Sequence, residues 1–244
     1  MGRTIAIVQA RMGSTRLPGK VLMELGGATM LAHVVARLRA AHGIDDVVVA
    51  TTGLAEDDAV VRAAEQLCAG WHRGAADDVL GRFLGAARAF HASAIVRVTA
   101  DCPLLDPGVI DQVVAALTPE VDYASNTHDR SYPRGLDVEA LHRDTLERLA
   151  RLATSPAARE HVTAFVMEAP QLVRVAQVRA ASDDADLRWT VDTDEDLAMV
   201  RGLHAAGLGD GRPYQALVAA VRARPELASN RHVAQKPWQV NHVA

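Results

Sequence analysis

Residues 5–20 read Ile-Ala-Ile-Val-Gln-Ala-Arg-Met-Gly-Ser-Thr-Arg-Leu-Pro-Gly-Lys. The stretch begins as an apolar strand and continues as a loop with two glycines, a proline and three cations, Arg11, Arg16 and Lys20. In α/β proteins, a strand that ends in a basic, glycine-containing loop before a helix brings backbone N–H groups and cations to a polyphosphate. The stretch therefore predicts an α/β fold with a polyphosphate site after its first strand.

The loop differs from the two commonest phosphate-binding loops. A Walker A loop needs Ser or Thr after the lysine, where this chain has Val21, and the G-x-G-x-x-G spacing of dinucleotide-binding folds is missing. The alternative is an ordinary loop whose basic residues bind nothing, because arginine is frequent throughout the chain. Three cations and two glycines directly after a strand favour the phosphate site.

Apolar strands alternate with helical patterns over the first half of the chain. Strands are expected at 5–9, 47–50, near Trp71 and at 95–98, and helices at 29–41, 57–67 and 77–90. This order predicts a right-handed, doubly wound, mostly parallel sheet, in which ligands bind at the carboxyl ends of the strands. Arg11, Thr51, Gly74 and Asp101 each follow a strand, so we expect them to meet in one crevice.

The second half is less regular and indicates a small additional β/α element. Residues 138–141 read as a strand of a different sheet or of a hairpin, and 171–179 as a half-buried strand. Ser155 as N-cap and Pro156 at the first helical position predict a helix from 155 to 168. No clear periodicity follows Pro225. We expect a single domain over residues 1–244.

The composition is that of an ordinary globular protein. Its charge balance means that an anionic ligand would need a local basic pocket. A net charge of -4, a pI near 6.2 and 4% aromatic residues argue against a general nucleic-acid or anionic-membrane surface. Cys68 and Cys102 are isolated, which favours a reducing compartment over a disulfide or zinc site. Gln9 and Arg11 interrupt the first apolar run, unlike in a signal peptide, and no segment approaches the ~20 apolar residues of a membrane span. We expect a cytoplasmic protein with no nucleic-acid or membrane partner.

Two aspartates lie where a carboxylate can hold a divalent cation. Asp101 follows an apolar strand, and Asp192 directly precedes Thr193, which together with Asp196 has the pattern of a helix-capping box. A strand-end aspartate can instead cap a turn or helix, a role that Asp106 fits better than Asp101 does. Magnesium is commonly held by one or two carboxylates together with substrate phosphates, and Asp101 and Asp192 supply that minimum.

Residues 9–20 have the pattern Q-A-R-x-x-S-x-R-L-P-x-K, which resembles the opening of the cytidylyltransferases that make CMP-activated sugars. The chain looks most similar to the spore-coat-polysaccharide-biosynthesis type, which is related to CMP-Kdo and acylneuraminate cytidylyltransferases. Further stretches that resemble this family are 72–83, 98–107, 126–139, 159–163 and 187–197. The resemblance therefore spans nearly the whole chain.

The resemblance implies a Rossmann-like nucleotidyltransferase fold and a magnesium-dependent cytidylyltransferase. Such an enzyme transfers CMP from CTP to an acidic acceptor and releases pyrophosphate. The resemblance also implies a role in polysaccharide biosynthesis and a homodimer, with residues about 121–180 forming an insertion for acceptor binding and dimerisation. CMP-Kdo synthetases have Q-G-D-E-P where residues 99–103 read Thr-Ala-Asp-Cys-Pro. That departure leaves the acceptor open between a sugar acid and another phosphate- or carboxylate-bearing metabolite.

The resemblance assigns roles to individual residues. Arg11, Lys20, Asp101 and Asp192 are implied to be catalytic, and Asp101 and Asp192 to hold Mg²⁺. The implied nucleotide contacts are Gln9, Ala10, Arg11, Gly13, Ser14, Arg16, Lys20, Arg73 and Gly74. The implied acceptor contacts are Asn126, Tyr132, Arg134, Asp137, Glu139 and His161. Arginine suits a carboxylate or phosphate because it binds in bidentate geometry, although a surface Arg134 and a packed His161 remain the alternatives.

Two other functions fit parts of the same pattern. A glycosyltransferase also binds a nucleotide diphosphate and a metal on a similar fold, and Asp192-Thr193-Asp194 matches its D-x-D pattern formally. We interpret Asp194 instead as a helix-start residue. The second alternative is a nucleotide-sensing or scaffold protein that binds CTP without consuming it.

Overall fold

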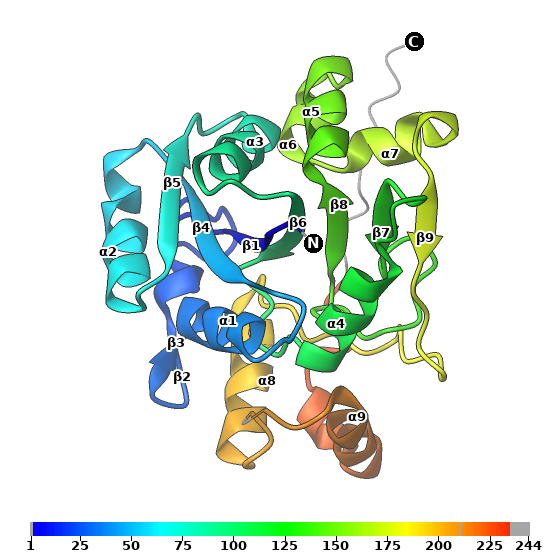
Figure 1. Ribbon diagram of the computed structural model, residues 1–244. Helices are drawn as coiled ribbons and strands as arrows, with labels where there is room; N and C mark the ends of the chain where they lie inside the picture. The colour runs from blue at the N-terminus through cyan, green and yellow to red at the C-terminus, as the bar shows by residue number, and fades with distance from the viewer. Residues whose placement is uncertain (1, 210, 235–244) are drawn as a thin grey trace.

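One sheet of seven strands forms the centre of the computed structural model, which describes residues 2–209 and 211–234 (Figure 1). The strand order is β5-β4-β1-β6-β8-β7-β9. The strands are β1 Thr4–Gln9, β4 Asp46–Thr52, β5 Gly70–Gly74, β6 Ala94–Thr99, β7 Tyr123–Ser125, β8 Glu139–His142 and β9 Val175–Gln177. Neighbouring strands from β5 to β6 pair in parallel, as do β7 and β9, whereas β8 is antiparallel to β6 and β7. The predicted doubly wound, mostly parallel sheet is confirmed.

Helices cover both faces of the sheet, and β1 contributes buried apolar side chains to the core on each face. Successive strand residues point to opposite faces, so Ile5 and Ile7 belong to one core and Ala6 and Val8 to the other. The helices of the Ala6 side are α1 Met30–Arg39, α2 Asp58–Gln66, α4 Pro107–Ala116, α8 Asp194–Ala205 and α9 Tyr214–Ala223. Those of the Ile5 side are α3 Val79–Ala89, α5 Arg143–Leu152, α6 Pro156–Glu160 and α7 Ala164–Glu168.

The elements predicted for the first half are present, and so are the predicted helix caps. Asp106 accepts a hydrogen bond from the backbone N–H of Val109 at the start of α4, and Ser155 caps α6 in the same way. Thr193 and Asp196 form a complete capping box at the start of α8. The local sequence therefore determines where these helices begin.

Three predictions for the second half need correction. Of the two alternatives for the strand at 138–141, the different sheet is wrong, because β8 pairs with β6 of the main sheet. β8 also pairs antiparallel with the preceding strand β7, as in a hairpin, across the long connection at 126–138. The helix predicted at 155–168 breaks into α6 and α7, because Val162 between them has a φ of 52°, outside the helical region. The strand predicted at 171–179 is reduced to β9, preceded by a 3-10 turn at Pro170–Leu172.

Several elements have no counterpart in the sequence prediction. These are α5, α9 and a short hairpin of β2 Glu24–Leu25 and β3 Ala28–Thr29. After Pro225, the chain forms a 3-10 turn at Pro225–Ala228 and then buries Asn230, while residues 235–244 lie outside the described part. No helix in the described part combines the length and apolar character needed to cross a membrane.

Candidate active site

Two adjoining hollows open at the carboxyl ends of β1 and β6. The larger cavity, of about 1170 Å³, extends between β6, β8 and the helices α6 and α7. The smaller hollow, of about 220 Å³, is lined by the loop that follows β1. The residues that line both are Gln9, Arg16, Thr99, Asp101 and Asp192. The two hollows therefore meet at the two aspartates.

Lys20 joins these aspartates in what we call the carboxylate cluster, Lys20, Asp101 and Asp192. Its Nζ donates to Asp101 Oδ2 at 2.8 Å, to Asp192 Oδ1 at 2.9 Å and to the carbonyl oxygen of Val191 at 2.8 Å. Burial lowers the pKa of Lys20, but the two carboxylates outweigh burial and the pKa lies above its ordinary value. The ammonium is therefore charged when it holds the two carboxylates together.

The loop after β1 aims Lys20 at this position through a left-handed residue. Gly19 has a φ of 72°, which glycine adopts without the steric cost that a Cβ brings, and a 3-10 turn at Lys20–Leu22 follows it. The backbone N–H of Gly19 also bonds to the carbonyl oxygen of Met12, which closes the loop on itself. The turn thus places Lys20 inward, while Arg16 reaches the cluster from the rim.

Asp192 is bound on both of its oxygens. Arg16 lies 3.0 Å from Oδ1, beside Lys20, and Arg188 donates to Oδ2 at 2.9 Å. Burial raises the pKa of Asp192, but Lys20, Arg16 and Arg188 outweigh it and lower the pKa below its ordinary value. The carboxyl is therefore held as a carboxylate.

A buried network behind Asp192 determines its position. The fully buried Asp196 accepts from Arg188 Nε and Nη2 at 2.8 Å each, and from the backbone N–H of Asp192 at 2.9 Å. Asn230 donates to Asp196 at 2.7 Å from the C-terminal segment. Asp196, expected only to start a helix, therefore also orients the residues around Asp192.

Asp101 reaches the cluster from the end of β6. The Thr99 hydroxyl donates to Asp101 Oδ1, and the backbone N–H of Val191 donates to the Asp101 carbonyl oxygen at 2.8 Å. That backbone bond joins the two loops that carry the aspartates. The carboxylates therefore meet although they are far apart in the chain.

A second buried ion pair lies in the larger cavity. Arg97 on β6 pairs with Glu139 on β8, and Glu139 also accepts from the hydroxyls of Tyr123 and Thr163. Burial raises the pKa of Glu139, but Arg97 and the two hydroxyls outweigh it and lower the pKa. His128 extends the network with a contact of 3.1 Å to the Tyr123 hydroxyl.

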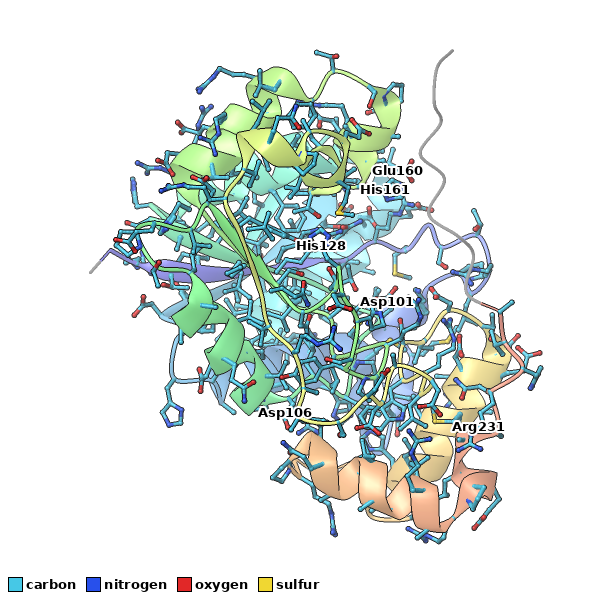
Figure 2. The ribbon with its side chains drawn as sticks, turned by 90° about the vertical axis from the view of Figure 1, so that its right-hand side faces the viewer. Asp101, Asp106, His128, Glu160, His161 and Arg231 are labelled. Carbon is cyan, nitrogen blue, oxygen red and sulfur yellow. The ribbon has the colours of Figure 1, made fainter. Side chains whose placement is uncertain are left out.

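The labelled side chains locate this cavity. Figure 2 shows Glu160 and His161 together, with His128 and Asp101 below them, whereas Asp106 lies apart, toward α9. Glu160, His161 and His128 all line the larger cavity. Burial lowers the pKa of His161 and of His128. Two imidazoles therefore face the cavity in an environment that favours their neutral form.

The structure brings most of the predicted site residues to the two hollows. Besides Gln9, Arg16, Asp101 and Asp192, these are Arg11, Ser14 and Lys20 in the smaller hollow and Arg134, Asp137, Glu139 and His161 in the larger cavity. The predicted residues that line neither are Ala10, Gly13, Arg73, Gly74, Asn126 and Tyr132. Thr51, expected in the same crevice, also lines neither.

Three of the residues outside the hollows have side chains engaged elsewhere. Arg73 donates to Asp58 and to the carbonyl oxygens of Thr52, at the end of β4, and Leu54. The amide of Asn126 bridges Leu136 and Val138, and the buried Tyr132 hydroxyl donates to Gln112. These side chains shape the loops around the site and do not point into it.

Arg97, His128, Thr163 and Arg188 are site residues that the sequence did not single out. Arg97 had a signal, because a charged side chain inside the apolar run 95–98 needs a buried partner. Arg188 lies in the stretch at 187–197 that resembles the family, but nothing local connects it to Asp192. His128 and Thr163 likewise lie in the stretches 126–139 and 159–163 that resemble the family, but nothing local connects them to Glu139.

Comparison with known proteins identifies the family. A cytidylyltransferase family model matches residues 5–219. The chain belongs to the cytidylyltransferase family. It is 32% identical over 242 residues to the spore coat polysaccharide biosynthesis protein SpsF of Bacillus subtilis, across 95% of this chain and 99% of that protein. It is 31% identical to the 3-deoxy-manno-octulosonate cytidylyltransferase of an Anaeromyxobacter species (strain Fw109-5), across 85% of this chain and 99% of that protein.

A solved structure supports the same assignment. The cytidylyltransferase from Leptospira borgpetersenii superposes with a TM-score of 0.91 at 30% identity, across 96% of this chain and 100% of that one. The protein is therefore a nucleotidyltransferase of the CTP-using family, as the resemblance implied. The glycosyltransferase alternative is not favoured.

The carboxylate cluster of this cytidylyltransferase has the donor chemistry of a magnesium site. Within residues 2–209 and 211–234, no three His, Cys, Asp or Glu side chains form a closed metal cage. Asp101 and Asp192 nevertheless bring two carboxylate oxygens to one cation, the ammonium of Lys20. Magnesium is commonly held by one or two carboxylates, with substrate phosphates and waters as the other ligands, so these residues fit it.

Proposed function

We propose that this cytidylyltransferase transfers CMP from CTP to an acidic acceptor in a magnesium-dependent reaction that releases pyrophosphate. The observation that carries the proposal is the carboxylate cluster at the junction of a small basic hollow and a larger polar cavity. A triphosphate in the first and an acceptor in the second would meet at Asp101 and Asp192.

The basic loop is the proposed triphosphate site. Arg11, Arg16 and Lys20 all line the smaller hollow, where they would neutralise the triphosphate and the leaving pyrophosphate. Asp101 and Asp192 would hold Mg²⁺, which, when bound, polarises the α-phosphate. Nucleotidyl transfer depends on such positioning and charge more than on covalent chemistry by the protein.

The larger cavity is the proposed acceptor site. Among the described residues, the guanidinium of Arg134 has no hydrogen-bond or ion-pair partner, although it lines the cavity. Burial and the neighbouring Arg130 lower its pKa, so an anion beside it would be stabilising. We propose Asp137, Glu139 and His161 as further acceptor-site residues. By analogy with the 3-deoxy-manno-octulosonate cytidylyltransferase, we propose as acceptor a sugar acid or a related phosphate- or carboxylate-bearing metabolite. By analogy with SpsF, we propose a role in polysaccharide biosynthesis.

The remaining parts of the proposal concern assembly and location. Residues 1–244 would form one nucleotidyltransferase domain, with about 121–180 as an insertion for acceptor binding and dimerisation. Leu172 and Val175 in that segment are exposed apolar residues, and burial of such side chains against a partner subunit would be favourable. We propose a homodimer in the cytoplasm.

Calorimetric titration with the four ribonucleoside triphosphates, with and without Mg²⁺, tests the nucleotide part. We expect selective, magnesium-enhanced binding of CTP. A panel of sugar acids and sugar phosphates is then screened for pyrophosphate release, with an Asp101→Asn variant as the blank. Preference for a nucleotide sugar over CTP would contradict the proposal.

A further inference from the structure

Lys20 lies where a divalent cation would bind Asp101 and Asp192. Its Nζ is 2.8 Å from Asp101 Oδ2 and 2.9 Å from Asp192 Oδ1. A divalent cation held by Asp101 and Asp192 would draw on the carboxylate oxygens that now bind the ammonium. Lys20 would therefore compete with such an ion for the two carboxylates.

The surroundings of Asp192 determine which of its contacts can be given up. Its Oδ2 is bonded to Arg188, which Asp196 holds in a fully buried network. Its Oδ1 is bonded to Lys20 and Arg16, both of which line the smaller hollow. Arg188 therefore holds Asp192 in place from the protein interior. Lys20 and Arg16, by contrast, line the hollow and could bind the phosphates of a nucleotide there.

The charges in and around the carboxylate cluster favour displacement of Lys20 more when CTP and the metal ion bind together than when the metal ion binds alone. Asp101, Asp192 and Asp196 are already balanced by Lys20, Arg16 and Arg188. A divalent cation alone would add charge to this balanced set. A triphosphate carries more negative charge than one divalent cation neutralises, so it provides Lys20 and Arg16 with new partners.

The residue type at position 20 suits such an exchange. Of the 26 lysine and arginine side chains, two are lysines, Lys20 and Lys236, so arginine is the usual cation of this chain. A guanidinium is a planar fork that binds in fixed geometry, whereas an ammonium is a compact charge on a flexible stem. A lysine ammonium can therefore exchange two carboxylate partners for a phosphate without having to align a planar group with the new partner.

We propose that Lys20 is an exchangeable counter-ion of the metal site. It holds Asp101 and Asp192 together until CTP binds, then moves to the triphosphate and leaves both carboxylates to the metal ion. CTP and the metal ion therefore bind with positive coupling, because each favours the same displacement of Lys20. The inference rests on the proposed function for the presence of CTP and a divalent cation.

Titration with Mn²⁺, followed by the electron paramagnetic resonance of the free ion, tests the competition directly. Without CTP, Lys20→Met is expected to bind Mn²⁺ about tenfold more tightly than wild type, because the competing charge is gone. Arg16→Gln is the matched control, since Arg16 contacts Asp192 but not Asp101, and it should change the affinity less. Asp101→Asn in the Lys20→Met background should remove the gain. Equal Mn²⁺ affinity in Lys20→Met and wild type would overturn the proposal.

A second measurement needs no substitution. Wild-type protein is acetylated with and without Mn²⁺, and Lys20 and Lys236 are quantified by peptide mass spectrometry. We expect saturating Mn²⁺ to raise the acetylation of Lys20 relative to Lys236, and added CTP to suppress it again. A ratio that Mn²⁺ leaves unchanged would overturn the exchange.

The two proposals fail in different ways. Absence of CTP binding or of pyrophosphate release would refute the proposed function, while the CTP-free Mn²⁺ titrations would still decide the competition. Magnesium-dependent pyrophosphate release together with unchanged Mn²⁺ affinity in Lys20→Met would refute only the role of Lys20 as a counter-ion.

Discussion

Asn230 Nδ2 donates a hydrogen bond of 2.7 Å to Oδ1 of the fully buried Asp196. The same nitrogen donates to the carbonyl oxygen of Arg188 at 3.1 Å. Because Arg188 and Asp196 together hold Asp192, the C-terminal segment takes part in positioning a residue of the candidate active site. Asn230 does so without itself lining either hollow.

Asn230→Leu should lower the free energy of unfolding by about 1.5–3 kcal/mol, because a buried carboxylate loses a hydrogen bond. It should also weaken the binding of CTP in the presence of Mg²⁺. Urea unfolding and calorimetry measure the two effects, and Arg231→Gln at the exposed neighbouring position should change neither. Lower stability with unchanged CTP affinity would limit Asn230 to a structural role.

Asp101→Asn and Asp192→Asn should each lower the rate of pyrophosphate release by about a hundredfold or more, because each removes charge from the carboxylate cluster. Near-native circular dichroism should accompany the loss. Asp194→Asn is the matched control, since Asp194 is exposed at the start of α8. A loss of similar size in Asp194→Asn would instead support a D-x-D metal motif.

The lowered pKa of Asp192 predicts a pH-dependent contribution to stability. A carboxyl whose pKa is lower in the folded than in the unfolded state stabilises the fold above its unfolded pKa, and the contribution disappears as the pH falls through the folded pKa. The difference in unfolding free energy between wild type and Asp192→Asn should therefore be constant above about pH 5 and shrink below about pH 4. Urea unfolding across this range measures it, and a difference that grows on acidification would contradict the assignment.

The Arg97–Glu139 pair predicts strong coupling between two substitutions. Arg97→Met or Glu139→Gln alone should cost about 3–5 kcal/mol, because each leaves a buried charge without its partner. The double variant should lose clearly less free energy of unfolding than the sum of the two single losses. A double-mutant cycle by urea unfolding gives the coupling energy, and additive losses would show that the two side chains act independently.

Alanine should have opposite effects on stability at Gly19, which has a positive φ, and at Gly202, which lies inside a helix. Gly19→Ala should lower stability by about 1–2 kcal/mol, because Gly19 has a φ of 72°, and should weaken CTP binding by shifting Lys20. Gly202→Ala should raise stability by about 0.5–1 kcal/mol, because Gly202 lies inside α8 with open space around it. Thermal unfolding compares them, and equal effects would argue against a strained turn at Gly19.

Local sequence was sufficient where short-range physics decides the structure. The alternation of apolar strands and helical patterns up to β6 predicted the parallel sheet, and Asp106, Ser155, Thr193 and Asp196 are helix caps as expected. The break at Val162 was not predictable, because Ser155 and Pro156 start a helix but no residue type marks its end there. The strand β8 was recognised, but not its place in the main sheet, because pairing depends on the partner strand.

The sequence by itself determined the α/β class, the basic loop after β1 and, by resemblance, the cytidylyltransferase family and the two aspartates. Each of these features can be recognised from a short contiguous stretch of the sequence. Only the tertiary structure decided that Lys20 joins Asp101 to Asp192, that Arg188, Asp196 and Asn230 hold Asp192 in place, and that Arg73 points away from the site. The reason is physical: charged side chains inside a protein must find partners, and which partners are within reach depends on how distant segments pack together.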